Sequence, residues 1–182
     1  CLLIEVASAE EAEADMVIAG WQTVEPDVAG RTDTIAQFDP PIIEPVIDSL
    51  LAGNAVPTSA ALYSRSLVCD LKWDEDLRKL DDWDWFVRAA WHARKIIRTR
   101  TTSYSWRQHP TQGIRSETML RNAREHHTIL KKLEEALAER GELTRERQKR
   151  LAQYFYKEMR VLSLYDRPGF EWGVRHIYQL DT

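Results

Sequence analysis

The sequence predicts an α/β domain followed by a helical extension, and three observations support this division. A continuous apolar run, Met16–Ala19, lies between Asp15 and Gly20, as in a strand buried on both faces. An amphipathic helix and a segment rich in Thr, Ile and aromatic residues then follow between residues 81 and 106. Beyond residue 116 only helical periodicity remains, so we assign 1–116 to the α/β domain and 117–182 to the extension.

Length, composition and charge exclude several classes of protein. A chain of 182 residues that is 43% hydrophobic can bury a core without disulfides or a structural metal. The net charge of -4 predicts no general attraction to nucleic acid. Cys1 and Cys69 lie far apart, without the paired spacing of a zinc site. No apolar run approaches the roughly 20 residues of a transmembrane segment, so we expect a cytoplasmic protein.

The first third of the chain is predicted to alternate between helices and strands. The Ala- and Glu-rich segment Ser8–Glu13 favours a helix, and Met16–Trp21 favours a strand. A loop is expected from Pro26 to Asp33 because of its Pro, Gly and Asp residues. Ile42–Leu51 predicts a short helix, and Pro57–Tyr63 predicts a strand entered through a proline.

The clearest helix begins at Asp81. Its first turn carries three carboxylates, which suit the positive end of the helix dipole. Apolar residues then recur at helical spacing at Trp83, Phe86, Val87, Ala90 and Trp91. This spacing favours a core position for Trp83 and Trp91, and a strand is predicted from Lys95 to Trp106.

Two long helices are predicted in the extension. They cover Glu117–Arg140, which Gly141 ends, and Arg145–Tyr165, which Pro168 and Gly169 end before a short last segment. Their apolar stripes support one functional hypothesis, a non-catalytic interaction module that forms an oligomer through these helices.

Aromatic and acidic residues are concentrated between residues 73 and 106, a combination that recurs in sugar-binding sites. Three segments in this region resemble the C-terminal, acceptor-side half of family 2 glycosyltransferases of the GT-A fold. They are the turn 73–77 (WDEDL), the helix start 81–88 (DDWDWFVR) and the strand end 104–109 (YSWRQH). Upstream, residues 14–20 and 53–65 resemble two strands of the same half, so the resemblance covers roughly residues 11–116.

The resemblance implies an inverting transfer of a sugar from a nucleotide-diphosphate donor to the hydroxyl of a glycan or another acceptor. Asp82 matches the general base of the family, and Asp81 replaces the Glu that usually precedes it. A carboxylate near a helix start is kept ionised by the dipole. The alternative is that Asp81 or Asp82 only caps the helix.

Further site residues follow from the same resemblance. It implies donor or acceptor contacts for Trp85, Arg88, Trp106, Arg107 and His109, with the last two near the donor diphosphate. His109 is also a candidate metal ligand. Arg88 has a structural alternative, an ion pair with Asp84 four residues earlier on the helix.

The donor-binding half of the family pattern does not precede these motifs. We therefore expect the chain to be a fragment in which the divalent cation, Mg²⁺ or Mn²⁺, is held mainly by residues outside it. The fragment alone is expected to bind no cofactor and to be inactive. A non-catalytic remnant is the alternative.

Two other polar clusters have structural explanations. Glu125, His126 and His127 are adjacent in a helix, where neighbouring side chains diverge, so we expect a solvated face instead of a metal site. The basic residues Arg145, Arg147, Lys149 and Arg150 alternate with glutamates, as on an exposed helix. Peripheral contact with an anionic membrane surface is the alternative for this cluster.

Overall fold

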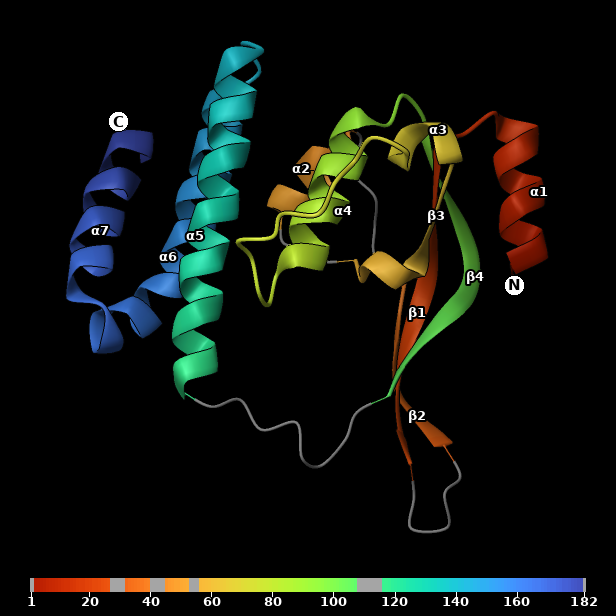
Figure 1. The fold of residues 1–182 in the computed structure, drawn as a ribbon, viewed down its shortest axis with the longest axis horizontal. Helices are drawn as coiled ribbons and strands as arrows, with labels where there is room; N and C mark the ends of the chain where they lie inside the picture. The colour runs from red at the N-terminus through yellow and green to blue at the C-terminus, as the bar shows by residue number, and fades with distance from the viewer. Residues whose placement is uncertain (1, 27–31, 40–44, 53–55, 108–115, 182) are drawn as a thin grey trace. The chain divides into compact units, whose positions relative to one another are not determined.

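The computed structural model describes residues 2–26, 32–39, 45–52, 56–107 and 116–181 (Figure 1). The chain divides into two compact units. The sheet unit comprises Cys1–Leu50, Asn54–Trp73 and Trp85–Gly113. The helical unit comprises Leu51–Gly53, Asp74–Asp84 and Ile114–Thr182. The presence of a sheet together with helices confirms the α/β class. Residues 74–84 belong to the helical unit, although the segments on both sides of them in the sequence belong to the sheet unit.

A long strand, β1 (Met16–Pro26), forms the centre of a mixed sheet. Strand β4 (Ile96–Arg107) pairs with it in parallel from Met16↔Ile96 to Val24↔Arg107. Because β4 occupies one edge along this length, β3 (Ala61–Tyr63) and β2 (Thr32–Phe38) share the other edge in succession, both antiparallel. The strand predicted from Met16 to Trp21 is confirmed as the first part of β1, and its first four residues are at most 2% exposed.

Gly20 lies where the backbones of three strands approach closely. A Cβ atom at this position would meet the Phe38 carbonyl oxygen at 3.1 Å and the Thr101 carbonyl oxygen at 3.5 Å. The register with β4 shifts on both sides of Gly20, so extra residues of β4 bulge there. A side chain at residue 20 therefore forces a strand apart.

Short helices complete the sheet unit. Helix α1 (Leu2–Ala12) contacts β1 and β4. Helix α2 (Val46–Leu51) confirms the short helix predicted after the prolines. The 3-10 helix η1 (Thr58–Ala60) leads into β3, and α3 (Arg65–Val68) follows it, capped by the Ser64 hydroxyl, which accepts from the Leu67 N–H at 3.2 Å.

Helix α4 (Asp81–His92) begins in the helical unit and continues into the sheet unit. Its buried positions include Phe86 and Ala89, both 0% exposed. The amphipathic helix predicted from Asp81 is thus confirmed, although Trp83 and Trp91 are only partly buried.

Three helices dominate the helical unit: α5 (Ser116–Glu139), α6 (Arg145–Tyr165) and α7 (Arg167–Asp181). Helix α6 packs against both of the others. The apolar stripes of α5 and α6 are buried in this packing, with Leu130, Leu137, Leu151 and Phe155 each 0% exposed. Gly141, at φ 68°, follows the end of α5 in the left-handed conformation that a helix C-terminus favours.

Two predictions about these elements were wrong. The expected loop up to Asp33 gives way to β2 at Thr32, because pairing with β1 outweighs the local turn residues. The short last segment is instead the 15-residue helix α7. Pro168 stands in its first turn, where no N–H is needed, and the Asp166 carboxylate accepts from the Gly169 N–H at 3.1 Å.

Candidate functional site

The start of α4 holds the two carboxylates predicted to be catalytic. Leu80 occupies the cap position, since its carbonyl accepts from the Asp84 N–H at 2.9 Å. Asp81 and Asp82 are therefore the first two helical residues. The Asp82 carboxylate accepts from the Trp83 N–H at 2.7 Å and so satisfies one free amide of the first turn. Neither Asp81 nor Asp82 occupies the cap position that the capping alternative gave to one of them.

Asp82 remains exposed, but its carboxyl is less acidic than usual. Desolvation by the surrounding protein raises the pKa of Asp82 above its ordinary value, and the neighbouring charge of Asp81 adds to this. The hydrogen bond from Trp83 acts in the opposite direction. A carboxylate with a raised pKa holds a proton more firmly and is a better general base than a free aspartate.

A buried glutamate from α5 fixes the segment that leads into this helix. The Glu125 carboxylate accepts three backbone N–H groups, from Arg78 at 3.0 Å and from Lys79 and Leu80 at 2.9 Å. Glu125 is only 7% exposed. The three amides lie directly before Asp81, so Glu125 sets the direction in which the chain enters the first turn of α4.

This arrangement corrects the prediction that Glu125, His126 and His127 form a solvated face. Glu125 and His127 are buried, and His126 packs edge-on against the Trp83 ring, with centroids 5.4 Å apart. Glu125 and His126 can point inward because each has a partner distant in sequence: backbone amides donate to Glu125, and the Glu158 carboxylate lies 3.0 Å from His126. No local pattern in the sequence reveals such partners.

Two further aspartates lie close to Lys132 of α5. Asp84 is 2% exposed, and its carboxylate lies 3.9 Å from the Lys132 ammonium group. Asp74, in the loop that precedes α4, forms an ion pair with the same lysine. Lys132 thereby links the predicted Trp-Asp-Glu turn to the third carboxylate of the helix start.

In the sheet unit, Trp85 is the centre of an aromatic cluster. Its ring stacks on Trp73 with centroids 5.4 Å apart, and Tyr63 packs edge-on at 4.9 Å. The indole N–H donates to the Leu71 carbonyl at 3.0 Å. Trp85 is 8% exposed whereas Trp73 is 52% exposed, so Trp73 presents the accessible ring and Trp85 supports it. The sequence reasoning assigned ligand contact to Trp85 and did not single out Trp73.

The remaining predicted residues also belong to the sheet unit. Trp106 and Arg107 are exposed at the end of β4, paired with Thr23 and Val24 of β1. Arg88 is partly buried on α4. His109, the predicted metal ligand, lies outside the described residues.

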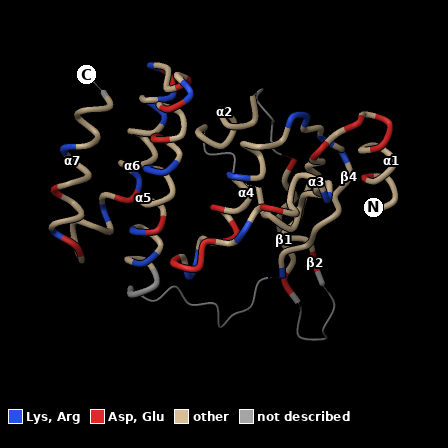
Figure 2. Tube along the Cα trace, turned by 45° about the horizontal axis from the view of Figure 1, so that its top comes forward, with Lys and Arg blue, Asp and Glu red and all other residues tan. Residues whose placement is uncertain are grey.

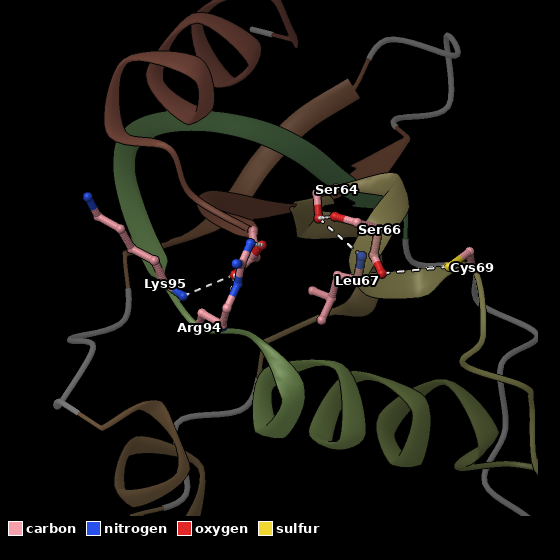
Figure 3. Close-up of polar contacts among 7 residues, drawn as sticks. Ser64, Ser66, Leu67, Cys69, Arg94 and Lys95 are labelled. Carbon is pink, nitrogen blue, oxygen red and sulfur yellow. Dashed lines mark hydrogen bonds and ion pairs between the residues drawn. The ribbon is translucent and has the colours of Figure 1, made fainter.

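The turn between α4 and β4 is fastened by Asp15, which the sequence reasoning did not select. Its carboxylate accepts from the Arg94 N–H at 2.9 Å and the Lys95 N–H at 3.3 Å, and it forms an ion pair with the Arg94 guanidinium at 3.1 Å. The bond from Arg94 lowers the pKa of Asp15, although burial opposes this. Figure 3 shows Arg94 and Lys95 here, with Ser64, Ser66 and Cys69 around α3.

A hollow of about 500 Å³ lies beside this turn, lined by Ser66, Asp70, His92 and Arg94 among others. It borders the last turn of α4, whereas Asp82 lies in the first. Its cation, Arg94, is already bound to Asp15.

Among the residues that the structure describes, no three His, Cys, Asp or Glu side chains are grouped as a metal site requires. Within the same ranges, no helix combines the length and apolar character needed to cross a bilayer. Comparison of the chain with known proteins gave no match to a family model, to a curated protein or to a solved structure.

Proposed function

We propose that the chain is the acceptor-side half of an inverting glycosyltransferase that uses a nucleotide-diphosphate sugar, with Asp82 as the general base. The single observation that carries this proposal is the state of the Asp82 carboxyl: exposed, at the start of a helix, and with a raised pKa. The ordered motifs that resemble family 2 glycosyltransferases supply the reaction class.

In the proposed reaction, the acceptor hydroxyl attacks the anomeric carbon of the donor sugar. The Asp82 carboxylate takes the hydroxyl proton as the new C–O bond forms. The bond from the anomeric carbon to the diphosphate breaks on the opposite face, and the nucleoside diphosphate leaves with the electron pair. The hydroxyl becomes acidic only as this bond forms, so a carboxylate is a sufficient base.

Other residues also have roles in this proposal. Asp81 is proposed as the neighbour that keeps the pKa of Asp82 raised, and Glu125 as the residue that fixes the helix start. Exposed Trp73, backed by Trp85, offers a face for an acceptor sugar. Arg107, together with Trp106, Arg88 and His109, is proposed to face the donor.

A divalent cation does not fit the described residues by themselves, because no three ligands are grouped there. Its binding is proposed for the donor-binding half, with His109 as one contributor.

The test is Asp82→Asn in the full-length natural protein, assayed against a panel of nucleotide sugars. We expect kcat/KM to fall by about 10³-fold or more, with the circular dichroism spectrum and donor binding unchanged. Asp76→Asn, which removes another exposed carboxylate of the helical unit, is the matched control and should retain full activity. Wild-type turnover by Asp82→Asn, or no turnover of any nucleotide sugar by the natural protein, would overturn the proposal.

A pH profile tests the assignment more sharply. The acid limb of activity should follow the ionisation of Asp82, and Asp81→Asn should move that limb to lower pH because it removes the neighbouring charge. An unmoved acid limb would assign the limb to another group.

The alternative function, an interaction module that pairs through the apolar stripes of its long helices, is less well supported. The apolar stripes of α5 and α6 are already buried within the chain, so they are not free for a partner.

A further inference from the structure

The exposed side of α6 carries a concentration of positive charge. The helix has six Lys or Arg residues and two Glu residues, a net charge of +4 in a chain whose net charge is -4. Arg147 is buried and paired with Glu142, so it does not contribute to the surface. The exposed cations are Arg145, Lys149, Lys157 and Arg160. Figure 2 marks Lys and Arg in blue along the trace of α6.

These cations share one face of the helix. At 100° per residue, Arg145, Lys149 and Arg160 lie within about 60° of one another, and Lys157 lies about 60° beyond Arg160. The exposed acid on α6 is Glu146, which is neutralised by Arg150 at 3.1 Å. We call the surface formed by Arg145, Lys149, Lys157 and Arg160 the basic face.

Large apolar and aromatic side chains project from the same face. Tyr156 is 70% exposed, and Leu164, two turns later, is 67% exposed. A hollow of about 540 Å³ opens between α6 and α7 beside Tyr156, with Ile177 and Ala152 in its wall and Lys149 and Lys157 at its rim. Tyr156 and Leu164 are not part of the core, which Phe155, Met159 and Leu162 fill from the opposite side of α6.

We infer that the basic face binds the surface of a membrane that contains anionic lipids. Lysine and arginine near a membrane surface are attracted to the phosphates of anionic lipids. Tyr156 and Leu164 suit the boundary between headgroups and acyl chains, where amphipathic aromatic and apolar groups are stabilised. The cations extend over four turns of the helix, about 22 Å, and over about 120° of its circumference, which matches a broad surface better than the single extended segment of an acidic peptide. The inference is independent of the proposed glycosyl transfer.

Vesicle co-sedimentation of the whole chain tests this inference. We expect binding to vesicles of 70% phosphatidylcholine and 30% phosphatidylglycerol, little binding to pure phosphatidylcholine, and a loss of binding as salt rises from 50 to 300 mM. The triple variant Lys149→Glu, Lys157→Glu, Arg160→Glu should reduce the partition coefficient by about tenfold or more.

The matched control reverses three exposed charges elsewhere, Lys72→Glu, Arg100→Glu and Lys131→Glu, and has the same net charge. It should retain at least half of the binding. A Tyr156→Ser, Leu164→Ser variant should weaken binding without changing its salt dependence. Circular dichroism establishes that each variant is folded.

Three outcomes would overturn the inference. The first is equal loss of binding in the triple variant and its control, which would mean that only net charge matters. The second is equal binding to neutral and anionic vesicles. The third is no vesicle binding together with salt-sensitive binding to polyglutamate, which would assign the basic face to an acidic protein partner.

Discussion

Each unit of this protein contains one buried carboxylate that holds a distant backbone segment, and the two differ in how their charge is balanced. Asp15 in the sheet unit accepts from the amides of Arg94 and Lys95 and also pairs with the Arg94 guanidinium. Glu125 in the helical unit accepts from three successive backbone amides. The comparison teaches that an exposed guanidinium, that of Arg94, balances the charge of Asp15, whereas Glu125 depends on the conformation of the backbone segment that it holds.

Asp82 provides the contrast to both. It is exposed, and its pKa is raised where that of Asp15 is lowered. The fold therefore stabilises the ionised form of Asp15 and disfavours the ionised form of Asp82. Substitutions at these carboxylates should separate structural roles from a chemical one.

The largest effect on stability is expected for Glu125→Ala. It leaves three amides without their acceptor and should lower the free energy of unfolding by about 3 kcal/mol, measured by urea denaturation. Hydrogen exchange at the amides of Arg78, Lys79 and Leu80 should accelerate. Glu135→Ala, on the exposed side of the same helix, should stay within about 0.5 kcal/mol of wild type. Similar losses in both variants would refute the holding role of Glu125.

Asp15→Asn should have the next largest effect, about 2 kcal/mol, because Asn keeps one oxygen acceptor but loses the ion pair. The folded pKa of Asp15 lies below its unfolded value of about 3.8. Its stabilisation is therefore present above that value and is lost as pH falls through the folded pKa. Urea denaturation between pH 2 and 6 should show a shallower acid decline in the variant than in Asp33→Asn, an exposed control. Parallel declines would contradict the assignment.

A smaller effect, visible only as a pH dependence, is expected at His127. Burial lowers the pKa of His127 below its ordinary 6.5, with the carboxylate of Glu158 acting in the opposite direction. Its ring packs edge-on against Phe155 at 5.0 Å. Because the folded state disfavours the proton, stability should be full above about pH 6.5 and decline below it. His127→Gln should flatten this decline, measured by thermal denaturation from pH 5 to 8. The exposed His92→Gln should not; equal slopes in the two variants would exclude His127.

Asp82→Asn should have the smallest effect on stability, within about 0.5 kcal/mol at pH 7. With a folded pKa above the unfolded one, the ionised carboxylate does not stabilise the fold, so its removal costs little. Thermal denaturation of the variant measures this directly. A loss as large as that of Asp15→Asn would class Asp82 with the structural carboxylates and weaken its case as a base.

The elements of the fold could be predicted where local periodicity and burial agree. The apolar run of β1 and the spacing along α4, α5 and α6 identified those elements to within a few residues, apart from the far end of β1. Strand β2 was missed because its partner, and not its own residues, determines its conformation. Helix α7 was predicted too short because a proline that can end one helix can equally begin another.

The candidate site could be predicted only in part. The position of Asp81 and Asp82 at a helix start was predicted from a motif within one helix, where sequence spacing determines position, and their catalytic role stays a prediction. Glu125 and Asp15 were missed because their partners lie about 45 and 80 residues away in the chain. Backbone amides are also chemically identical at every residue, so no residue type marks the three that Glu125 accepts.

The parallel pairing of β1 with β4 has a consequence for synthesis of the chain. The central strand is made before β4, and the partner along one of its whole edges ends only at Arg107. During translation, that edge of β1 stays uncovered until some 80 further residues have been added to the chain. The packing of α5, α6 and α7 instead joins helices that follow one another directly. The nascent sheet unit is therefore the part that most needs protection from aggregation while the ribosome completes it.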